Sequence, residues 1–308
     1  KIGQLFIFGF NGTTLNPEIQ NMIENEYIGG VIIMGKNIED KEQVKKLNNN
    51  LQGISQLPLF IAIDQEGGSV LRIKEDNDTN ISQRKILSKE QAYEISTKRS
   101  KLLKDLGVNM NMAPVAEYIT NKESFMYDRT FSGDKQNVAQ KVYSALKGYN
   151  DSKMISVLKH FPGHDNSSQD SHNNFPNVNI SQQEWDEYIY TFKYSIDKQM
   201  VDALMIGHIK FPNIDDKPAT LSKIIIDSPL VTVRKENGVY NLERFSASSK
   251  SGASRTSRNI LLIASAESNP ILRLATITPP NAETGSPASA SLQACKRVSR
   301  TATPHALL

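Results

Sequence analysis

Four of the five histidines lie close together in the sequence, at His160, His164, His172 and His208. The fifth, His305, lies far from them near the C-terminus. Imidazole titrates near neutral pH, so histidine is the side chain most suited to moving protons under physiological conditions. A single buried histidine is usually structural, but four in one segment favour a functional site.

One chemistry that these residues could support is metal binding. His160, His164 and His172, together with Asp165 and Asp170, offer ligands that zinc or iron would accept. The first two histidines flank Phe-Pro-Gly, which indicates a strand end and a turn rather than a helical pair of ligands. The lone Cys295 also excludes a multi-cysteine zinc site. The sequence therefore favours a site without a metal or a cofactor.

The other chemistry is acid/base catalysis in a loop. In Asp170-Ser171-His172, a carboxylate precedes an imidazole by two residues. A tight turn would let Asp170 accept a hydrogen bond from one ring nitrogen of His172 and leave the other nitrogen to give or take a proton. Asp-x-His is common in solvated loops, so this spacing alone does not establish a dyad.

Short apolar runs alternate with amphipathic segments, as in a sheet of parallel strands joined by helices. The predicted strands are Leu5–Phe8, Gly30–Met34, Leu59–Asp64, Val108–Pro114, Ile155–Phe161 and Ala203–Ile209. The predicted helices are Glu39–Leu51, Lys89–Leu106, Asn137–Tyr149 and Ser181–Gln199. Polar residues gather where strands end, including Asp64, Asn111, Lys159 and His208. In a (β/α)8 barrel, all such ends meet at one mouth, where active sites lie.

A barrel of this type needs eight strands, and only six are visible before residue 230. From Phe245 onward the sequence is rich in Ser, Ala, Thr and Arg, and only Ile260–Ala264 has the composition of a strand. Such a segment buries too little apolar surface to offset its chain entropy. We therefore expect an α/β fold of the TIM-barrel type, incomplete at about six βα units. It would span residues 1–238, with a disordered tail over residues 239–308.

The charge distribution argues against nucleic acid as a partner. The net charge is +3, but residues 231–308 carry ten Lys or Arg and four Glu, which gives 10 − 4 = +6 and leaves −3 for the remainder. The body has no basic stripe with interleaved aromatic residues. No run approaches the roughly 20 apolar residues of a membrane span. The sequence favours the cytoplasm over the cell surface or secretion without deciding between them, because the chain begins at Lys1. It predicts no oligomeric state.

Several strings of residues together carry a family resemblance. In order along the chain they are KIGQLFIFGF at 1–10, IDQEGG at 63–68, NMNMAPVAE at 109–117, DRTFSGD at 128–134, KHFPGH at 159–164, DSH at 170–172, ALMIGHI at 203–209 and PATLS at 218–222. Over about residues 1 to 230 the chain resembles the catalytic barrel of glycoside hydrolase family 3, in its bacterial β-N-acetylhexosaminidase branch. KHFPGH followed by DSH is highly specific to that branch.

The resemblance implies an exo-acting, retaining enzyme that removes terminal β-linked N-acetylglucosamine from peptidoglycan fragments or chitin oligomers without a cofactor. The residues expected to bind the sugar are Asp64, Arg129, Lys159, His160 and His208. His172 would be the general acid/base, oriented by Asp170, in a role that most glycosidases give to a carboxylic acid.

The sequence departs from the family at the nucleophile. A retaining mechanism needs a carboxylate on the opposite face of the sugar, which in the family is an Asp that ends the seventh strand. No Asp occurs after Asp227, so hydrolysis would require one of Glu236, Glu243, Glu267 or Glu283 to replace it, and we expect none of these to lie at a strand end. The resemblance stops after Gly238, so we expect a shifted reading frame there and no hydrolysis by the chain as written. The alternative is a protein that binds carbohydrate without cleaving it.

Smaller departures affect no predicted catalytic group. Asp165 replaces the Gly that usually follows Pro-Gly-His, and Glu117 stands where an Asp is common.

Overall fold

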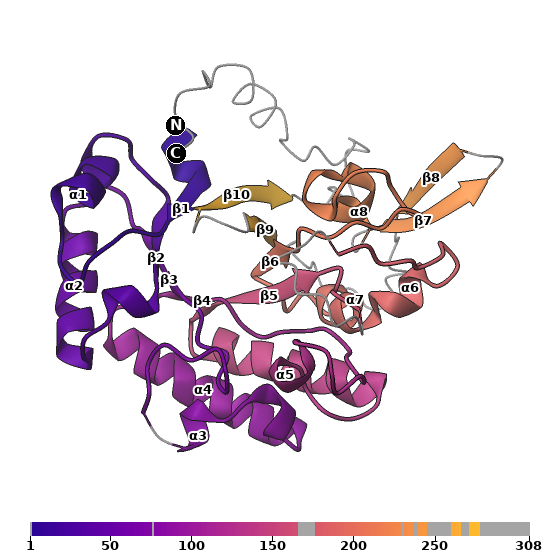
Figure 1. Cartoon of the computed structure of the whole chain (residues 1–308), viewed down its shortest axis with the longest axis horizontal. Helices are drawn as coiled ribbons and strands as arrows, with labels where there is room; N and C mark the ends of the chain where they lie inside the picture. The colour runs from indigo at the N-terminus through magenta and orange to yellow at the C-terminus, as the bar shows by residue number, and fades with distance from the viewer. Residues whose placement is uncertain are drawn as a thin grey trace, which may run out of the picture.

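The computed structural model describes residues 2–75, 77–165 and 176–228, and four later strands up to residue 277. Eight strands form a closed barrel in the order β1-β10-β9-β6-β5-β4-β3-β2 (Figure 1). They are β1 Phe6–Phe8, β2 Gly30–Ile33, β3 Phe60–Ile63, β4 Met110–Asn111, β5 Ile155–Phe161, β6 Ala203–Ile206, β9 Ile260–Ser265 and β10 Ile271–Ile277. A separate hairpin, β7 Val231–Glu236 and β8 Val239–Arg244, stands outside the barrel.

Helices cover the outside of the barrel and follow the strands in the chain. They are α1 Pro17–Glu24, α2 Lys41–Gly53, α3 Asn77–Asn80, α4 Lys89–Asp105, α5 Lys135–Asp151, α6 Trp185–Tyr188, α7 Tyr190–Asp197 and α8 Lys223–Asp227. Side-chain caps fix where the long helices begin, since Asp40, Ser88 and Asp134 each accept a hydrogen bond from the backbone three residues later. Within the described ranges, no helix is long and apolar enough to cross a membrane.

The six predicted parallel strands are confirmed, although β4 keeps only two residues of the predicted Val108–Pro114. After Asn111 the chain leaves the sheet, because Pro114 has no N–H for the ladder and the Ala113 N–H turns back to Asn111. The chain returns beside β5 at Val115, which forms an isolated parallel bridge with Lys159. This detour brings residues 115–117 next to the end of β5.

The predicted helix over residues 181–199 is divided. Ser181 does not cap it: the Glu184 carboxylate accepts from both the backbone N–H and the hydroxyl of Ser181, and the helix begins only at Trp185. Ile189 then separates α6 from α7. Aromatic packing around Trp185, Tyr188 and Phe211 takes the place of a continuous helix.

Two strands from beyond residue 238 close the barrel. The first, β9, contains Ile260–Ala264, the one segment of the predicted tail with the composition of a strand, and pairs in parallel with β6. The sequence does not predict β10, which runs antiparallel to both β9 and β1. The six parallel units therefore do not stand as an open sheet. The division of the chain at residue 238 into a barrel and a tail stays a prediction.

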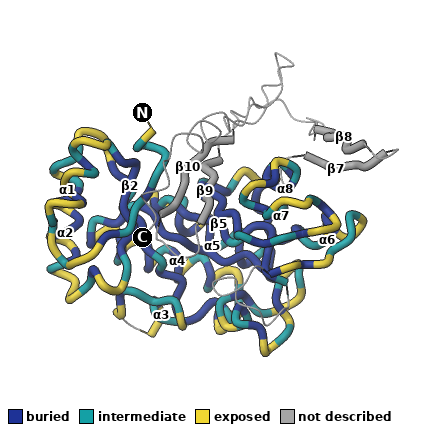
Figure 2. Tube along the Cα trace, turned by 45° about the horizontal axis from the view of Figure 1, so that its top comes forward, coloured by how far each residue is buried: buried dark blue, intermediate teal, exposed yellow. Residues whose placement is uncertain are grey.

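The core forms separate layers inside and outside the barrel. Ile7, Ile32, Met110, Val157 and Ile263 belong to the cluster that fills the barrel interior. Two larger clusters lie between the strands and the outer helices. Figure 2 shows this as buried strands surrounded by helices whose outer faces are exposed. The parallel strands read as continuous apolar runs because both of their faces are buried.

Candidate active site

The predicted sugar-binding residues lie at the carboxyl ends of neighbouring strands. Asp64 directly follows β3. Lys159 and His160 are the last two residues of β5 before its final residue, Phe161. Arg129 lies in a short 3-10 helix, Tyr127–Arg129, in the long connection after β4. His208 comes two residues after β6. Because β3 to β6 are parallel, all these residues project from one end of the barrel.

An alternating chain of charges joins four of the residues at this mouth. The Lys159 ammonium lies 2.8 Å from Asp64 Oδ1 and 2.6 Å from Glu66 Oε1. Glu66 in turn accepts two hydrogen bonds from Arg129, from Nε at 3.0 Å and from Nη2 at 2.8 Å. Such a two-point contact between guanidinium and carboxylate fixes direction as well as distance.

Burial makes this network strongly interdependent. Lys159 and Glu66 side chains are 2% and 1% exposed, whereas Asp64 and Arg129 keep 18% and 12% of their side-chain surface exposed. Burial by itself would raise the pKa of Glu66, but the charges of Lys159 and Arg129 lower it to about 2. Burial likewise opposes the charge of Arg129, yet Glu66 raises the pKa of its guanidinium above the ordinary value. Glu66 and Arg129 are therefore both ionised. Asp64 and Arg129, the two more exposed members of the network, lie on its solvent side.

Two of the clustered histidines meet at one carboxylate, Glu117. His160 Nδ1 lies 2.8 Å from Glu117 Oε1, and the His164 backbone N–H donates to Oε2 at 2.7 Å. His164 Nδ1 lies 3.1 Å from Oε1. Burial would raise the pKa of Glu117, but the two histidines hold it well below the ordinary value. Burial lowers the pKa of His160 to about 4, which outweighs the opposing effect of Glu117.

Glu117, His160 and His164 are also the described residues best placed to hold a metal, since one ligand-type atom from each lies within 4.8 Å of the others. The hydrogen bonds do not favour it. Arg129 can only donate, and its Nη2 lies 3.4 Å from His160 Nε2, so Nε2 accepts and the proton belongs on Nδ1. The nitrogen that faces Glu117 then carries a hydrogen rather than a free lone pair.

A family model for the "Glycosyl hydrolase family 3 N terminal domain" matches residues 1–239. The chain belongs to glycoside hydrolase family 3. This finding confirms the resemblance seen in the sequence and assigns residues 1–239, which include the six parallel strands β1 to β6, to the N-terminal domain of the family.

Named relatives agree with this assignment. A beta-hexosaminidase A of Pseudoalteromonas piscicida is 33% identical over 229 residues, which cover 68% of this chain and 38% of the relative. A beta-hexosaminidase of Methylobacillus flagellatus is 30% identical over 229 residues, which cover 69% of this chain and 63% of the relative. A glycoside hydrolase family 3 beta-N-acetylglucosaminidase from Paenibacillus has a solved structure that matches with a TM-score of 0.68 and 33% identity, over 73% of this chain and 44% of that one. The chain thus spans less than two thirds of each of these relatives.

The structure of this family 3 chain brings Asp64, Arg129, Lys159 and His160 together. His208 lies one strand further on, with its Nδ1 2.5 Å from Thr220 Oγ1. Its neighbour Gly207 lies against His160, since a Cβ placed on Gly207 would be 3.4 Å from the His160 Cβ. Asp170 and His172 lie outside the described residues, so the acid/base dyad stays a prediction.

Three residues of the site were not predicted as such. Glu66 and Glu117 connect the cations and histidines, and Arg72 Nη2 lies 3.8 Å from Asp64 Oδ2. The buried Nε of Arg72 has no hydrogen-bond partner among the described residues. Glu66 carried a usable signal, because it lies two residues beyond Asp64 in the same string. The pairing of Glu66 with Arg129 joins residues 63 positions apart, which no local pattern could indicate.

The four glutamates considered as replacement nucleophiles are placed as follows. Glu236 is the last residue of β7, so the expectation that none lies at a strand end is wrong for this residue, although β7 is not a barrel strand. Glu243 lies within β8. Glu267 and Glu283 are outside the described residues, and Glu267 comes two positions after β9 ends at Ser265.

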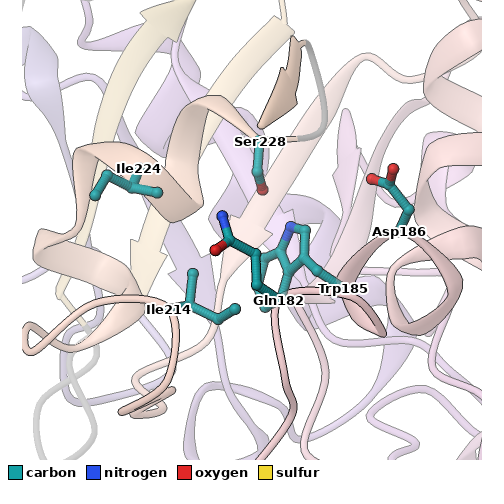
Figure 3. Close-up of a pocket in the computed structure, with 6 residues that line it drawn as sticks. All are labelled: Gln182, Trp185, Asp186, Ile214, Ile224 and Ser228. Atoms are coloured by element: carbon teal, nitrogen blue, oxygen red, sulfur yellow. The ribbon is translucent and has the colours of Figure 1, made fainter. Parts of the chain in front are cut away.

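A cavity away from the mouth is too small to compete as a sugar site. It lies between α6, α8 and Ile214, where Figure 3 shows Gln182, Trp185 and Ser228 around it. It has room for about one water molecule. The buried indole Nε1 of Trp185 has no partner among the described residues and suits such a water.

Proposed function

We propose that the mouth of the barrel binds a terminal β-linked N-acetylglucosamine unit, and that the parent enzyme is an exo-acting, retaining β-N-acetylhexosaminidase acting on peptidoglycan fragments or chitin oligomers. The observation that supports this most is the charged chain Asp64–Lys159–Glu66–Arg129 at the strand ends. Sugar hydroxyls both donate and accept, so neighbouring carboxylates and cations with fixed directions suit them. The relatives named as hexosaminidases support the sugar class.

For the acid/base step we propose His172, oriented by Asp170, as the family resemblance implies. Proton transfer by such a group contributes about 10² to 10⁴ in rate. In a version of the protein that hydrolyses its substrate, His172→Ala should lower kcat within that range for substrates with poor leaving groups, and Asp170→Asn should lower it less.

The chain as written should bind the sugar without hydrolysing it. No Asp occurs after Asp227, so the residue that forms the covalent intermediate in the family has no counterpart of its own type. This absence favours the second candidate function, a carbohydrate-binding protein, for this particular chain.

Calorimetric titration with N-acetylglucosamine tests the binding proposal. Asp64→Asn should weaken binding at least about tenfold, because a charge-assisted hydrogen bond contributes about 1.5–3 kcal/mol. The matched control is Asp151→Asn on the exposed face of α5, which should bind like the original protein. Equal binding by Asp64→Asn, or no binding by the original protein, would refute the proposal.

Release of nitrophenol from nitrophenyl β-N-acetylglucosaminide tests the lack of hydrolysis. We expect no enzymatic release from the purified chain. If release occurs and disappears in Glu267→Gln but not in Glu283→Gln, then Glu267 has replaced the missing Asp and the chain is an enzyme.

A further inference from the structure

Glu117 contacts both ends of the turn that leaves β5. Its carboxylate accepts from the backbone N–H of His160 at 3.3 Å and from that of His164 at 2.7 Å. Both imidazoles also present Nδ1 to it. The side chain is 1% exposed, and between the two histidines lie only Phe161, Pro162 and Gly163. One buried carboxylate therefore spans the entire turn.

We propose that Glu117 is a positioning residue that holds His160 as the Nδ1–H tautomer, so that its Nε2 lone pair accepts from the proposed sugar-binding residue Arg129, and that it anchors the turn at His164. The His160 ring lies between a group that only accepts and a group that only donates, Glu117 and Arg129. Only one arrangement of the ring proton satisfies both neighbours. The part of this inference that concerns sugar rests on the proposed function.

The charges around His160 agree with a neutral ring. Among the described residues, the groups beside it are the Glu117 carboxylate, the Arg129 guanidinium and the His164 imidazole, which lies edge-on with its centroid 5.0 Å away. The Glu66 carboxylate, paired with Arg129, also interacts with it electrostatically. Glu117 favours the protonated ring, whereas burial and Arg129 disfavour it, and the pKa stays near 4. A neutral Nε2 can accept the hydrogen bond from Arg129, which an imidazolium cannot do.

A glutamine could not do the same work at this position. Four donors converge on two carboxylate oxygens, and an amide would offer one oxygen and one NH2 group to them. Glu117→Gln therefore sets an N–H against at least one of the four donors. Glu117→Asp keeps both oxygens and the charge, but withdraws them by one methylene.

Nitrogen NMR of isotope-labelled histidine measures the tautomer directly, with His160 assigned by its loss in His160→Gln. In the original protein at neutral pH, Nδ1 should carry the proton and Nε2 should not. Glu117→Gln should show a mixture of tautomers and bind N-acetylglucosamine about tenfold more weakly, consistent with the loss of one charge-assisted hydrogen bond. Glu117→Asp should restore the Nδ1–H tautomer at least in part, and the exposed control Glu94→Gln should match the original protein in both measurements.

The inference is overturned if His160 in the original protein carries its proton on Nε2 or is doubly protonated at neutral pH. It is also overturned if Glu117→Gln leaves both tautomer and affinity unchanged. If Glu117→Gln does not fold, the spectra of the original protein and of Glu117→Asp decide. A protein with the expected tautomer that binds no N-acetylglucosamine would refute the proposed function and leave the positioning role of Glu117 intact.

Discussion

At the scale of single residues, Lys159 is the cation that compensates the charges of two carboxylates. Its ammonium contacts Asp64 and the almost fully buried Glu66. Removing one partner from a buried ion pair leaves an uncompensated charge, which typically costs about 3–5 kcal/mol. We expect Lys159→Met to lower the free energy of unfolding, measured in urea, by about that amount. Lys147→Met, which breaks an exposed pair with Asp151 on α5, should leave it nearly unchanged. Equal effects of the two changes would contradict the burial argument.

Two groups of the site with lowered pKa values, Glu66 and His160, should make the fold sensitive to acid. The pKa of Glu66 falls from 4.5 to about 2 on folding, so its contribution is complete above pH 4.5 and is lost as the pH falls towards 2. The pKa of His160 falls from 6.5 to about 4, so its contribution is complete above pH 6.5 and is lost as the pH falls towards 4.

Urea unfolding across this range separates the two groups. Between pH 6.5 and about 4, His160 should lower the free energy of unfolding by up to about 1.4 kcal/mol per pH unit. His160→Gln should flatten that part of the profile and keep the loss below pH 4.5 that Glu66 causes. An unchanged slope in His160→Gln would show that another group titrates there.

The site shows how far residue types alone can lead. Asp64, Lys159 and His160 were predictable because each ends an apolar strand and belongs to a distinctive string. Glu117 was seen in the sequence only as a departure from a common Asp, and its role depends on the detour around Pro114 that brings it beside β5. A carboxylate that acts across such a detour leaves no local pattern to read.

At the scale of elements, the spacing of β2 and β3 is set by a glycine. A Cβ on Gly30 would lie 2.3 Å from the carbonyl oxygen of Phe60 and 2.7 Å from its Cβ, so any side chain there must push the two strands apart. We expect Gly30→Ala to destabilise the protein by about 1–3 kcal/mol in thermal or urea unfolding, as other overpacked sites do.

Gly53, the last residue of α2, is the matched control. Nothing lies within 4 Å of a Cβ placed on it. Gly53→Ala should stabilise by about 0.4–1 kcal/mol, because alanine restricts the unfolded chain more than glycine does. If Gly30→Ala and Gly53→Ala change the free energy of unfolding in the same direction, the close contact between Gly30 and Phe60 does not limit the size of the residue at position 30.

Helices were predictable where the apolar periodicity extended over several turns and began at a residue able to cap the helix. The predicted helices over residues 89–106 and 137–149 agree closely with α4 and α5. The helix over residues 181–199 was less well predicted, because its capping-box spacing is used for a turn at Ser181 instead. Tertiary packing around Trp185 decides where that helix begins.

At the scale of the whole molecule, closure of the barrel depends on residues beyond the family match. Ile263 of β9 is fully buried inside the barrel, although its surroundings in the sequence look unlike a folded domain. If β9 closes the barrel, Ile263→Ala should lower the free energy of unfolding by about 2–5 kcal/mol. The exposed Leu221→Ala should change it by less than about 0.5 kcal/mol. A negligible effect of Ile263→Ala would show that the first six strands fold without β9.

The barrel class was predictable because six apolar strands with polar ends alternate with helices. The last two strands, β9 and β10, were harder to predict from the sequence, since composition suggested one strand at most. The antiparallel direction of β10 depends on its pairing with β1, near the other end of the chain. Sequence periodicity carries no information about such distant partners.

The reversed direction of β10 brings the first and last strands of the barrel to a common rim. Because β10 is antiparallel to β1 and pairs with it from Phe6↔Arg273 to Phe8↔Ile271, the end of β10 and the start of β1 lie at the same rim, opposite the sugar mouth. In an all-parallel barrel these two ends would lie at opposite rims, and a linker would have to cross the whole sheet. Here the end of β10 and the start of β1 are separated only by the distance between neighbouring strands, as in a β-hairpin.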